Sequence, residues 1–168
     1  MPPRSKPAFS AFLCPIPRTL WLAGAMLLAS CDHGLTPPDT PPSGTLRAVI
    51  TYTGAWPPSE ALQDLRFVAM TFVPRDTADI LDLRRIVFSP TPLAFNVSSD
   101  TVVLSDVKTG TYVYSGVAQR YSQSFVDWRP VGLVEANGGV FHVRAGETTD
   151  VSVDVDFEHP PLFPPVLP

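Results

Sequence analysis

The feature that most constrains the fold is a strict alternation of side chains near the carboxyl end of the chain. Over residues 148–157 the apolar side chains are Val151, Val153, Val155 and Phe157, and the polar ones between them are Asp150, Ser152, Asp154 and Asp156. Successive side chains of a strand point to opposite faces, so this period predicts a strand with one buried and one solvated, acidic face. No long amphipathic helix is visible elsewhere, which favours an all-β fold.

The other strand candidates are short and are bounded by turn residues. They are rich in β-branched, aromatic or other apolar residues, and they comprise residues 45–54, 64–74, 85–89, 93–97, 101–104, 111–121, 131–135 and 139–143. Residues 64–74 are apolar almost without interruption, which predicts a strand covered on both faces. Asn137-Gly138-Gly139 predicts a tight hairpin, because Asn and Gly tolerate positive φ. About seven short strands without intervening helices predict one antiparallel β-sandwich, at residues 45–158.

Two segments have more than one interpretation. In residues 75–92, Asp76 or Thr77 can cap a helical turn that brings Ile80, Leu81 and Leu83 near the core, or the segment is an irregular crossover that ends in a strand. The tail, residues 159–168, has proline at five of its ten positions and cannot continue a sheet. It is either a disordered end or an apolar strap lying on the domain.

Residues 1–30 have the pattern of a secretory signal peptide. They contain Arg4, Lys6 and Arg18 and no acidic residue, and Arg18 is soon followed by the apolar run LWLAGAMLLA. This run is about ten residues long, whereas a membrane-spanning helix needs roughly 20. The segment is therefore expected to be removed, not to span the membrane.

The apolar run ends in Leu28-Ala29-Ser30-Cys31, which resembles the lipobox of bacterial lipoproteins. The resemblance implies that Cys31 receives a diacylglyceryl group, that the chain is cut before it, and that the domain lies outside the cytoplasm in the cell envelope, on the inner or the outer membrane. Two or three acyl chains hold a protein durably at a bilayer. The proline-rich residues 31–44 would then form an extended tether. The alternatives are an ordinary signal peptide with a chance cysteine, or an uncleaved start.

Charge and cysteine content exclude several classes of function. The chain has 12 Lys and Arg, and three of them lie in residues 1–30. The remaining chain would have nine Lys and Arg and 16 Asp and Glu, and so a formal net charge of −7. This argues against binding to nucleic acid and against electrostatic docking on anionic lipid. Cys14 lies in the signal peptide and Cys31 is committed to lipid, so no disulfide is expected.

A second resemblance concerns residues 102–118, VVLSDVKTGTYVYSGVA. This stretch resembles transthyretin-like β-sandwiches, the group that includes carboxypeptidase regulatory-like domains. Leu104, Val107, Gly110 and Tyr112 match its pattern, and residues 44–49 match the usual form of its opening strand. The resemblance implies a seven-stranded fold that serves, usually without catalysis, as a support, a stalk or a binding module.

Four side chains are candidates for ligand binding. Trp56 and Trp128 stand in loops next to prolines, and Arg129 and Tyr121 are near Trp128 in the sequence. Exposed aromatic rings beside polar groups can stack on a sugar ring or an apolar ligand. The alternative is that each tryptophan closes an open end of the sandwich. If both bind ligand, they should be exposed and close together.

No residue pattern predicts a catalytic site, a metal site or a cofactor. His142 and His159 have no convergent set of ligands, and no strained elbow surrounds a serine. The carboxylates of residues 150, 154, 156 and 158 are spread along one strand face. We expect a non-catalytic interaction or structural module that is held to the membrane through Cys31 and meets an envelope protein or glycan. The alternative is a lipoprotein that binds carbohydrate or a small ligand through its loop tryptophans.

Overall fold

The computed structural model describes residues 41–165 of the chain. The predicted signal peptide, Cys31 and most of the tether lie outside the described residues. A compact unit begins at Pro41. Its elements, in chain order, are β1 (Ser43–Thr53), η1 (Ser59–Ala61), β2 (Asp64–Met70), α2 (Thr77–Leu81), β3 (Ile86–Phe88), β4 (Ser99–Lys108), β5 (Gly110–Tyr112), β6 (Tyr114–Arg120), β7 (Trp128–Leu133), η2 (Ala136–Gly139), β8 (Phe141–Val143) and β9 (Thr148–Asp156).

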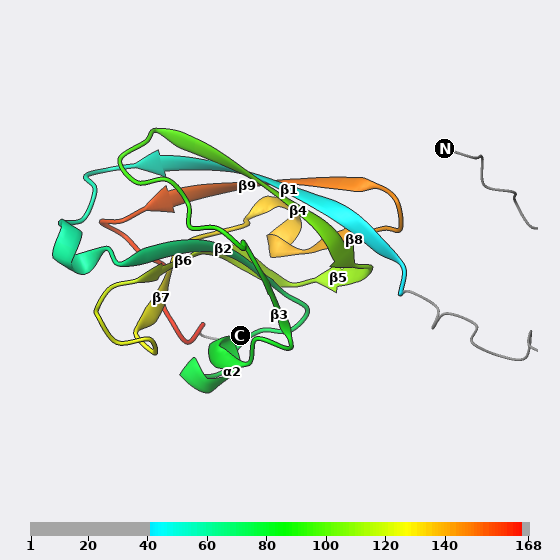
Figure 1. The fold of residues 1–168 in the computed structure, drawn as a ribbon, viewed down its shortest axis with the longest axis horizontal. Coiled ribbons are helices and arrows are strands. Elements are labelled where there is room, and N and C mark those ends of the chain that lie inside the picture. The colour runs from blue at the N-terminus through cyan, green and yellow to red at the C-terminus, as the bar shows by residue number, and fades with distance from the viewer. Residues whose placement is uncertain (1–40, 166–168) are drawn as a thin grey trace, which may run out of the picture. The chain divides into compact units, whose positions relative to one another are not determined.

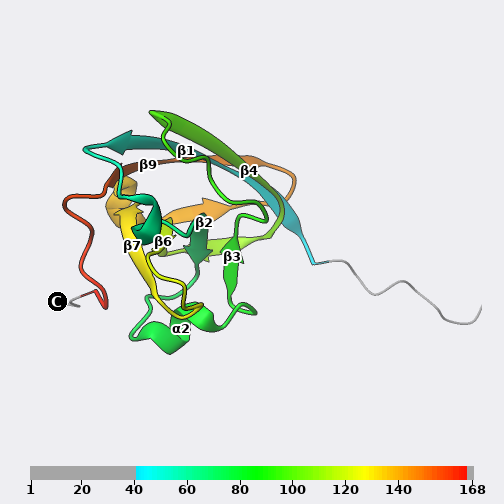
Figure 2. The ribbon, with the colours of Figure 1, turned by 60° about the vertical axis from the view of Figure 1, so that its left-hand side comes forward.

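The predicted all-β sandwich is confirmed. One sheet has the order β4-β1-β9 and the other the order β3-β2-β6-β7, while β5 and β8 form a short separate pair. Figures 1 and 2 both place β1, β4 and β9 on one side of the sandwich and α2 on the other. One pairing departs from the antiparallel pattern, because β1 and β9 are parallel. These strands are far apart in the chain, so no tight turn forces them to run in opposite directions.

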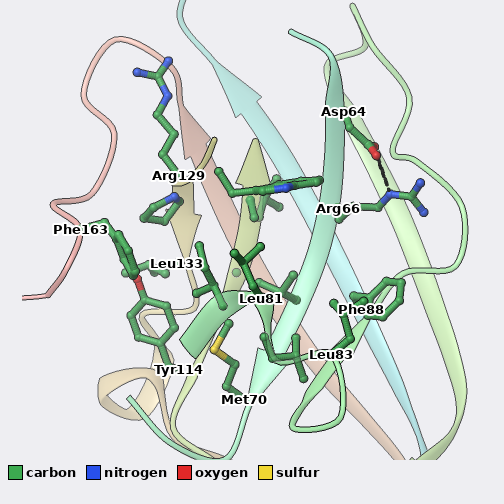
Figure 3. Close-up of a pocket in the computed structure, with 18 of the residues that line it drawn as sticks. Asp64, Arg66, Met70, Leu81, Leu83, Phe88, Tyr114, Arg129, Leu133 and Phe163 are labelled. Atoms are coloured by element: carbon green, nitrogen blue, oxygen red, sulfur yellow. Dashed lines mark hydrogen bonds and ion pairs between the residues drawn. The ribbon is translucent and has the colours of Figure 1, made fainter. Parts of the chain in front are cut away.

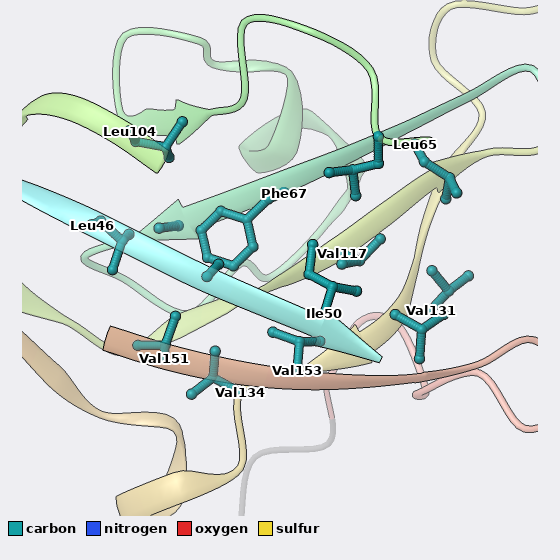
Figure 4. Close-up of a cluster of buried hydrophobic side chains, with 14 of the residues drawn as sticks. Leu46, Ile50, Leu65, Phe67, Leu104, Val117, Val131, Val134, Val151 and Val153 are labelled. Carbon is teal, nitrogen blue, oxygen red and sulfur yellow. The ribbon is translucent and has the colours of Figure 1, made fainter. Parts of the chain in front are cut away.

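The core is built from the inner faces of the two sheets. Leu46 and Ile50 of β1, Phe67 of β2, Val117 of β6 and Val153 of β9 each expose 1% of their surface or less. Figure 4 shows their side chains between the strands of the two sheets. In β9 the valines of the predicted alternation are buried, whereas Asp150, Ser152 and Asp154 are exposed. The period of two therefore identified the buried face of this strand correctly.

The backbones of the two sheets come very close at Gly132 of β7. A Cβ atom at this position would lie 2.5 Å from the carbonyl oxygen of Asp154 and 3.0 Å from the Cα atom of Val155. Both contacts are to the backbone of β9, so a side chain cannot turn aside to relieve them. Glycine at residue 132 is required by the distance between the sheets.

Three predictions about local structure were wrong. Residues 93–97 form no strand, because Asn96 has φ 57° and the Ala94 amide donates to the side chain of Asp100. The single strand predicted at 111–121 is divided at Val113 into β5 and β6, which belong to different sheets. Asn137, Gly138 and Gly139 do have positive φ, but they join β7 to β8 and not two paired strands.

The predicted helical turn after Pro74 is present as α2. Asp76 caps it, since its carboxylate accepts a hydrogen bond of 3.1 Å from the amide of Asp79. The segment then continues into β3, so it contains both a helical turn and a terminal strand. Of its apolar side chains, Ile80 packs against a second buried cluster, formed by Met70, Ile86 and Tyr114 on the outer face of the four-stranded sheet, whereas Leu81 and Leu83 remain exposed and do not reach the core as expected. Within residues 41–165, no helix has the length and apolar character that a membrane crossing requires.

Candidate functional site: an apolar cavity on the outer face of the four-stranded sheet

The outer face of the four-stranded sheet is largely apolar, which is unusual for a face turned away from the core. Leu65, Phe67 and Ala69 of β2 point to the core, and Asp64, Arg66, Val68 and Met70 point outward, to the same side as Tyr114 of β6. β2 lies between β3 and β6. The apolar residues 67–70 are thereby explained, because this part of the strand is covered on both faces.

A cavity of about 420 Å³ lies on this outer face. Its floor is formed by strand residues, and its walls come from the segment around α2 and from Phe163 of the tail (Figure 3). The apolar side chains that line it include Val68, Met70, Ile80, Leu81, Leu83, Ile86, Phe88, Tyr114, Trp128, Leu133 and Phe163. Phe163 of the tail lies on this face, as the strap alternative predicted, whereas its neighbour Leu162 is exposed.

The structure brings together three of the four predicted ligand-binding residues. Trp128 and Arg129 line the cavity, and they begin β7, so Trp128 does not stand in a loop as predicted. The guanidinium of Arg129 lies 5.5 Å from the centre of the Tyr121 ring. The indole nitrogen of Trp128 donates a hydrogen bond of 2.9 Å to the carbonyl of Phe125. This bond fixes the orientation of the indole in the cavity wall.

Trp56 has a different place. Its ring centre lies 4.8 Å from that of Tyr52 and 4.8 Å from that of Phe157, and it packs against the edge of the core. It is not among the residues that line the cavity. Trp56 therefore closes the core between β1 and the end of β9, as the alternative interpretation of the tryptophans expected.

The two arginines of the cavity lining are already bound to other protein groups. Arg66 donates from Nε to Asp64 at 3.0 and 3.2 Å, and from Nη1 to the carbonyls of Ser89 and Pro90 at 2.9 and 2.7 Å. Arg129 donates from Nε to the Gln119 side chain at 3.0 Å. Figure 3 shows the head of Arg129 turned away from the apolar lining.

Tyr114 is the buried polar residue of the cavity. It exposes 9% of its surface, and no described residue forms a hydrogen bond with its hydroxyl. Burial raises the pKa of this hydroxyl to about 12, since the charged form would lose its hydration. The Tyr52 hydroxyl likewise has no partner among the described residues, but Tyr52 lies outside the cavity. Tyr112 differs from both, because its hydroxyl donates to the Lys108 carbonyl at 3.0 Å.

Asp156, Glu158 and His159 bring their ligand atoms within 4.8 Å of one another at the surface. The Asp156 carboxylate is engaged within this turn, since it accepts from the amides of Glu158 and His159 at 2.9 and 3.3 Å and lies 2.9 Å from Nδ1 of His159. The hydrogen bond between the side chains lowers the pKa of Asp156 and raises that of His159. Residues 156–159 therefore form a turn at the end of β9 that is held by hydrogen bonds within the turn.

Several cavity residues were not predicted from the sequence. Tyr114, Met70 and Phe163 come from separate parts of the chain, and no local motif joins them. The available signal was the nearly continuous apolar run at 64–74, which predicted a cover over its second face. No protein-family model matches the chain, and no curated protein or solved structure shows significant similarity to it.

Proposed function

We propose that this chain is a lipid-anchored protein of the bacterial envelope whose β-sandwich is a non-catalytic binding module, with a small apolar ligand held in the outer-face cavity. The observation that carries the proposal is the cavity itself. Its volume of about 420 Å³ falls within the range of roughly 300–1,000 Å³ that is usual for ligand pockets. Its lining is mainly aliphatic and aromatic, which favours a ligand that leaves water for an apolar surrounding.

The transthyretin-like or carboxypeptidase regulatory-like assignment of the domain belongs to this proposal. Of the residues that match the pattern, Leu104, Val107 and Tyr112 are buried in the sandwich. The Tyr112 ring stacks on Phe141 with 5.5 Å between the ring centres. The burial of these residues supports the assignment.

The anchor is supported by the sequence alone. Cys31 ends a lipobox-like stretch, and the first strand begins at Ser43, so a proline-rich segment separates the two. At about 3.1 Å per extended residue, this segment would hold the domain roughly 35 Å from the lipid. In cells that make the full chain, Cys31→Ser should move the protein from the membrane fraction to the soluble fraction. Retention of that variant in the membrane would contradict lipid anchoring.

Ligand binding is tested with a neutral fluorescent probe, N-phenyl-1-naphthylamine. The protein used is residues 31–168 with Cys31→Ser, which retains every described element without needing detergent. Ala118 lines the cavity, so Ala118→Phe should fill it and weaken probe binding by at least about tenfold. Thr51→Phe adds the same side chain at an exposed position of β1 and should leave binding unchanged. Equal binding by all three proteins, each shown to be folded by circular dichroism, would contradict a site in the cavity.

A further inference from the structure

We propose that the cavity selects a neutral amphiphile, a molecule with an apolar body and one hydroxyl or carbonyl group, and that this polar group forms a hydrogen bond with the hydroxyl of Tyr114. This inference rests on the proposed function and specifies the class of ligand for the same site. Three features of the cavity point to this class: the burial of Tyr114, the ion pairing and orientation of the charged groups in the lining, and the position of Phe163.

Tyr114 supplies a buried polar group among the apolar side chains of the lining. It is the first residue of β6 and pairs with Met70 of β2, so the sheet fixes its backbone. A buried hydroxyl without a partner loses its hydration and gains nothing in return. A ligand atom that bonds with this hydroxyl would remove that deficit, and a pure hydrocarbon would not.

The charges of the lining favour a neutral ligand over an anion. The guanidinium of Arg66 is balanced by Asp64. That of Arg129 has no carboxylate partner among the described residues, but its head points away from the apolar lining (Figure 3). A ligand carboxylate among the apolar side chains would therefore lose its hydration without gaining a cation that faces it. A hydroxyl or carbonyl group carries a much smaller desolvation penalty.

The tail determines access to the hydroxyl. Figure 3 shows the Tyr114 oxygen at the end of the ring that faces Phe163. Within the described part of the chain, no hydrogen bond holds residues 160–165 to the sandwich, so Phe163 is kept in place by apolar contact. A polar group of a ligand reaches Tyr114 when the Phe163 side chain moves aside, and the ligand's apolar body replaces the contacts that this ring makes.

The test compares two displacing ligands of equal chain length. Decan-1-ol and decanoate are each titrated against bound N-phenyl-1-naphthylamine. The pH is about 8, at which the carboxylate of decanoate is ionised. Decan-1-ol should displace the probe at a lower concentration than decanoate. Tyr114→Phe should weaken decan-1-ol about fivefold, the factor that corresponds to one net hydrogen bond of about 1 kcal/mol. It should change the affinities for the probe and for decanoate by less than about twofold.

Tyr52→Phe is the matched control, because it removes a second buried hydroxyl without a described partner from outside the cavity. It should leave the binding of all three molecules unchanged. The inference is overturned if decanoate binds as well as decan-1-ol, or if Tyr114→Phe leaves decan-1-ol unaffected, as it would if a water molecule satisfied the hydroxyl. Failure of the probe itself to bind would overturn the proposed function as well, whereas probe binding without discrimination would overturn the ligand class alone.

Discussion

Arg66→Ala should destabilise the sandwich far more than Arg47→Ala, although Arg47 makes the shorter ion pair. Arg47 lies 2.6 Å from Asp150, and the two side chains expose 51% and 57% of their surface. Arg66 lies 3.0 Å from Asp64, and these side chains expose only 21% and 16%. Solvent screens the first pair and largely does not reach the second, so burial and not distance should decide the effect.

The size of the effect follows from what each truncation leaves behind. Loss of the Arg66 guanidinium leaves a largely buried carboxylate and two carbonyls, those of Ser89 and Pro90, without their donors. Charged hydrogen bonds of this kind contribute about 1.5–3 kcal/mol each but are not additive, and water can enter from the cavity. We expect a loss of about 2–3 kcal/mol. Loss of the exposed Arg47 group should have no measurable effect on stability.

The assay is urea unfolding of residues 31–168 with Cys31→Ser, followed by tryptophan fluorescence. For a domain of this size, a loss of about 2–3 kcal/mol should lower the midpoint by roughly 1–2 M urea, with an unchanged slope. Arg47→Ala should have the midpoint of the parent protein. Equal shifts for the two variants, or no shift for Arg66→Ala, would refute the argument from burial.

Three further predictions concern stability and titration. Gly132→Ala should lower the free energy of unfolding by about 1–3 kcal/mol, because its Cβ meets the backbone of β9, and a neutral effect would contradict the close approach. The raised pKa values of Tyr52 and Tyr114 stabilise the fold below the ordinary tyrosine pKa of about 10. Stability should therefore fall as the pH rises above 10, and Tyr114→Phe should reduce that slope in denaturation curves. The pKa of His159, measured by NMR, should lie above its ordinary value and move toward that value in Asp156→Asn. The pair stabilises the fold between the lowered pKa of Asp156 and the raised pKa of His159, and this contribution is lost as the pH leaves that window on either side.

The parts of the fold that were predictable from the sequence are those set by residues close together in the chain. The alternation in β9 assigned each side chain to a face correctly, because the period of a strand is a property of its own backbone. The cap of α2 was predictable for the same reason, since Asp76 and Asp79 are three residues apart. In contrast, the apolar pattern at 93–97 misled, because the chain turns at Asn96 with a positive φ and the Ala94 amide donates to the side chain of Asp100 in β4.

The candidate site was only partly predictable, because it depends on which strands become neighbours. Trp128 and Arg129 could be selected from their own stretch of chain, but Tyr114 and Phe163 join them only through the sheet order and the path of the tail. Trp56 looked equivalent to Trp128 in the sequence. Its partners are Tyr52 of β1 and Phe157, which directly follows β9, and the parallel pairing of these two strands was not predicted.

The most direct test of the binding account is a methyl NMR titration of residues 31–168, with Cys31→Ser, using decan-1-ol. The account predicts shift changes and intermolecular contacts at the methyl groups of Met70, Ile80 and Leu133, which line the cavity. The methyl groups of Ile50 and Val153, on the opposite side of the sheet in the core, should show neither. Contacts confined to the core or to the surface around Trp56, or no contacts at saturating ligand, would contradict the account.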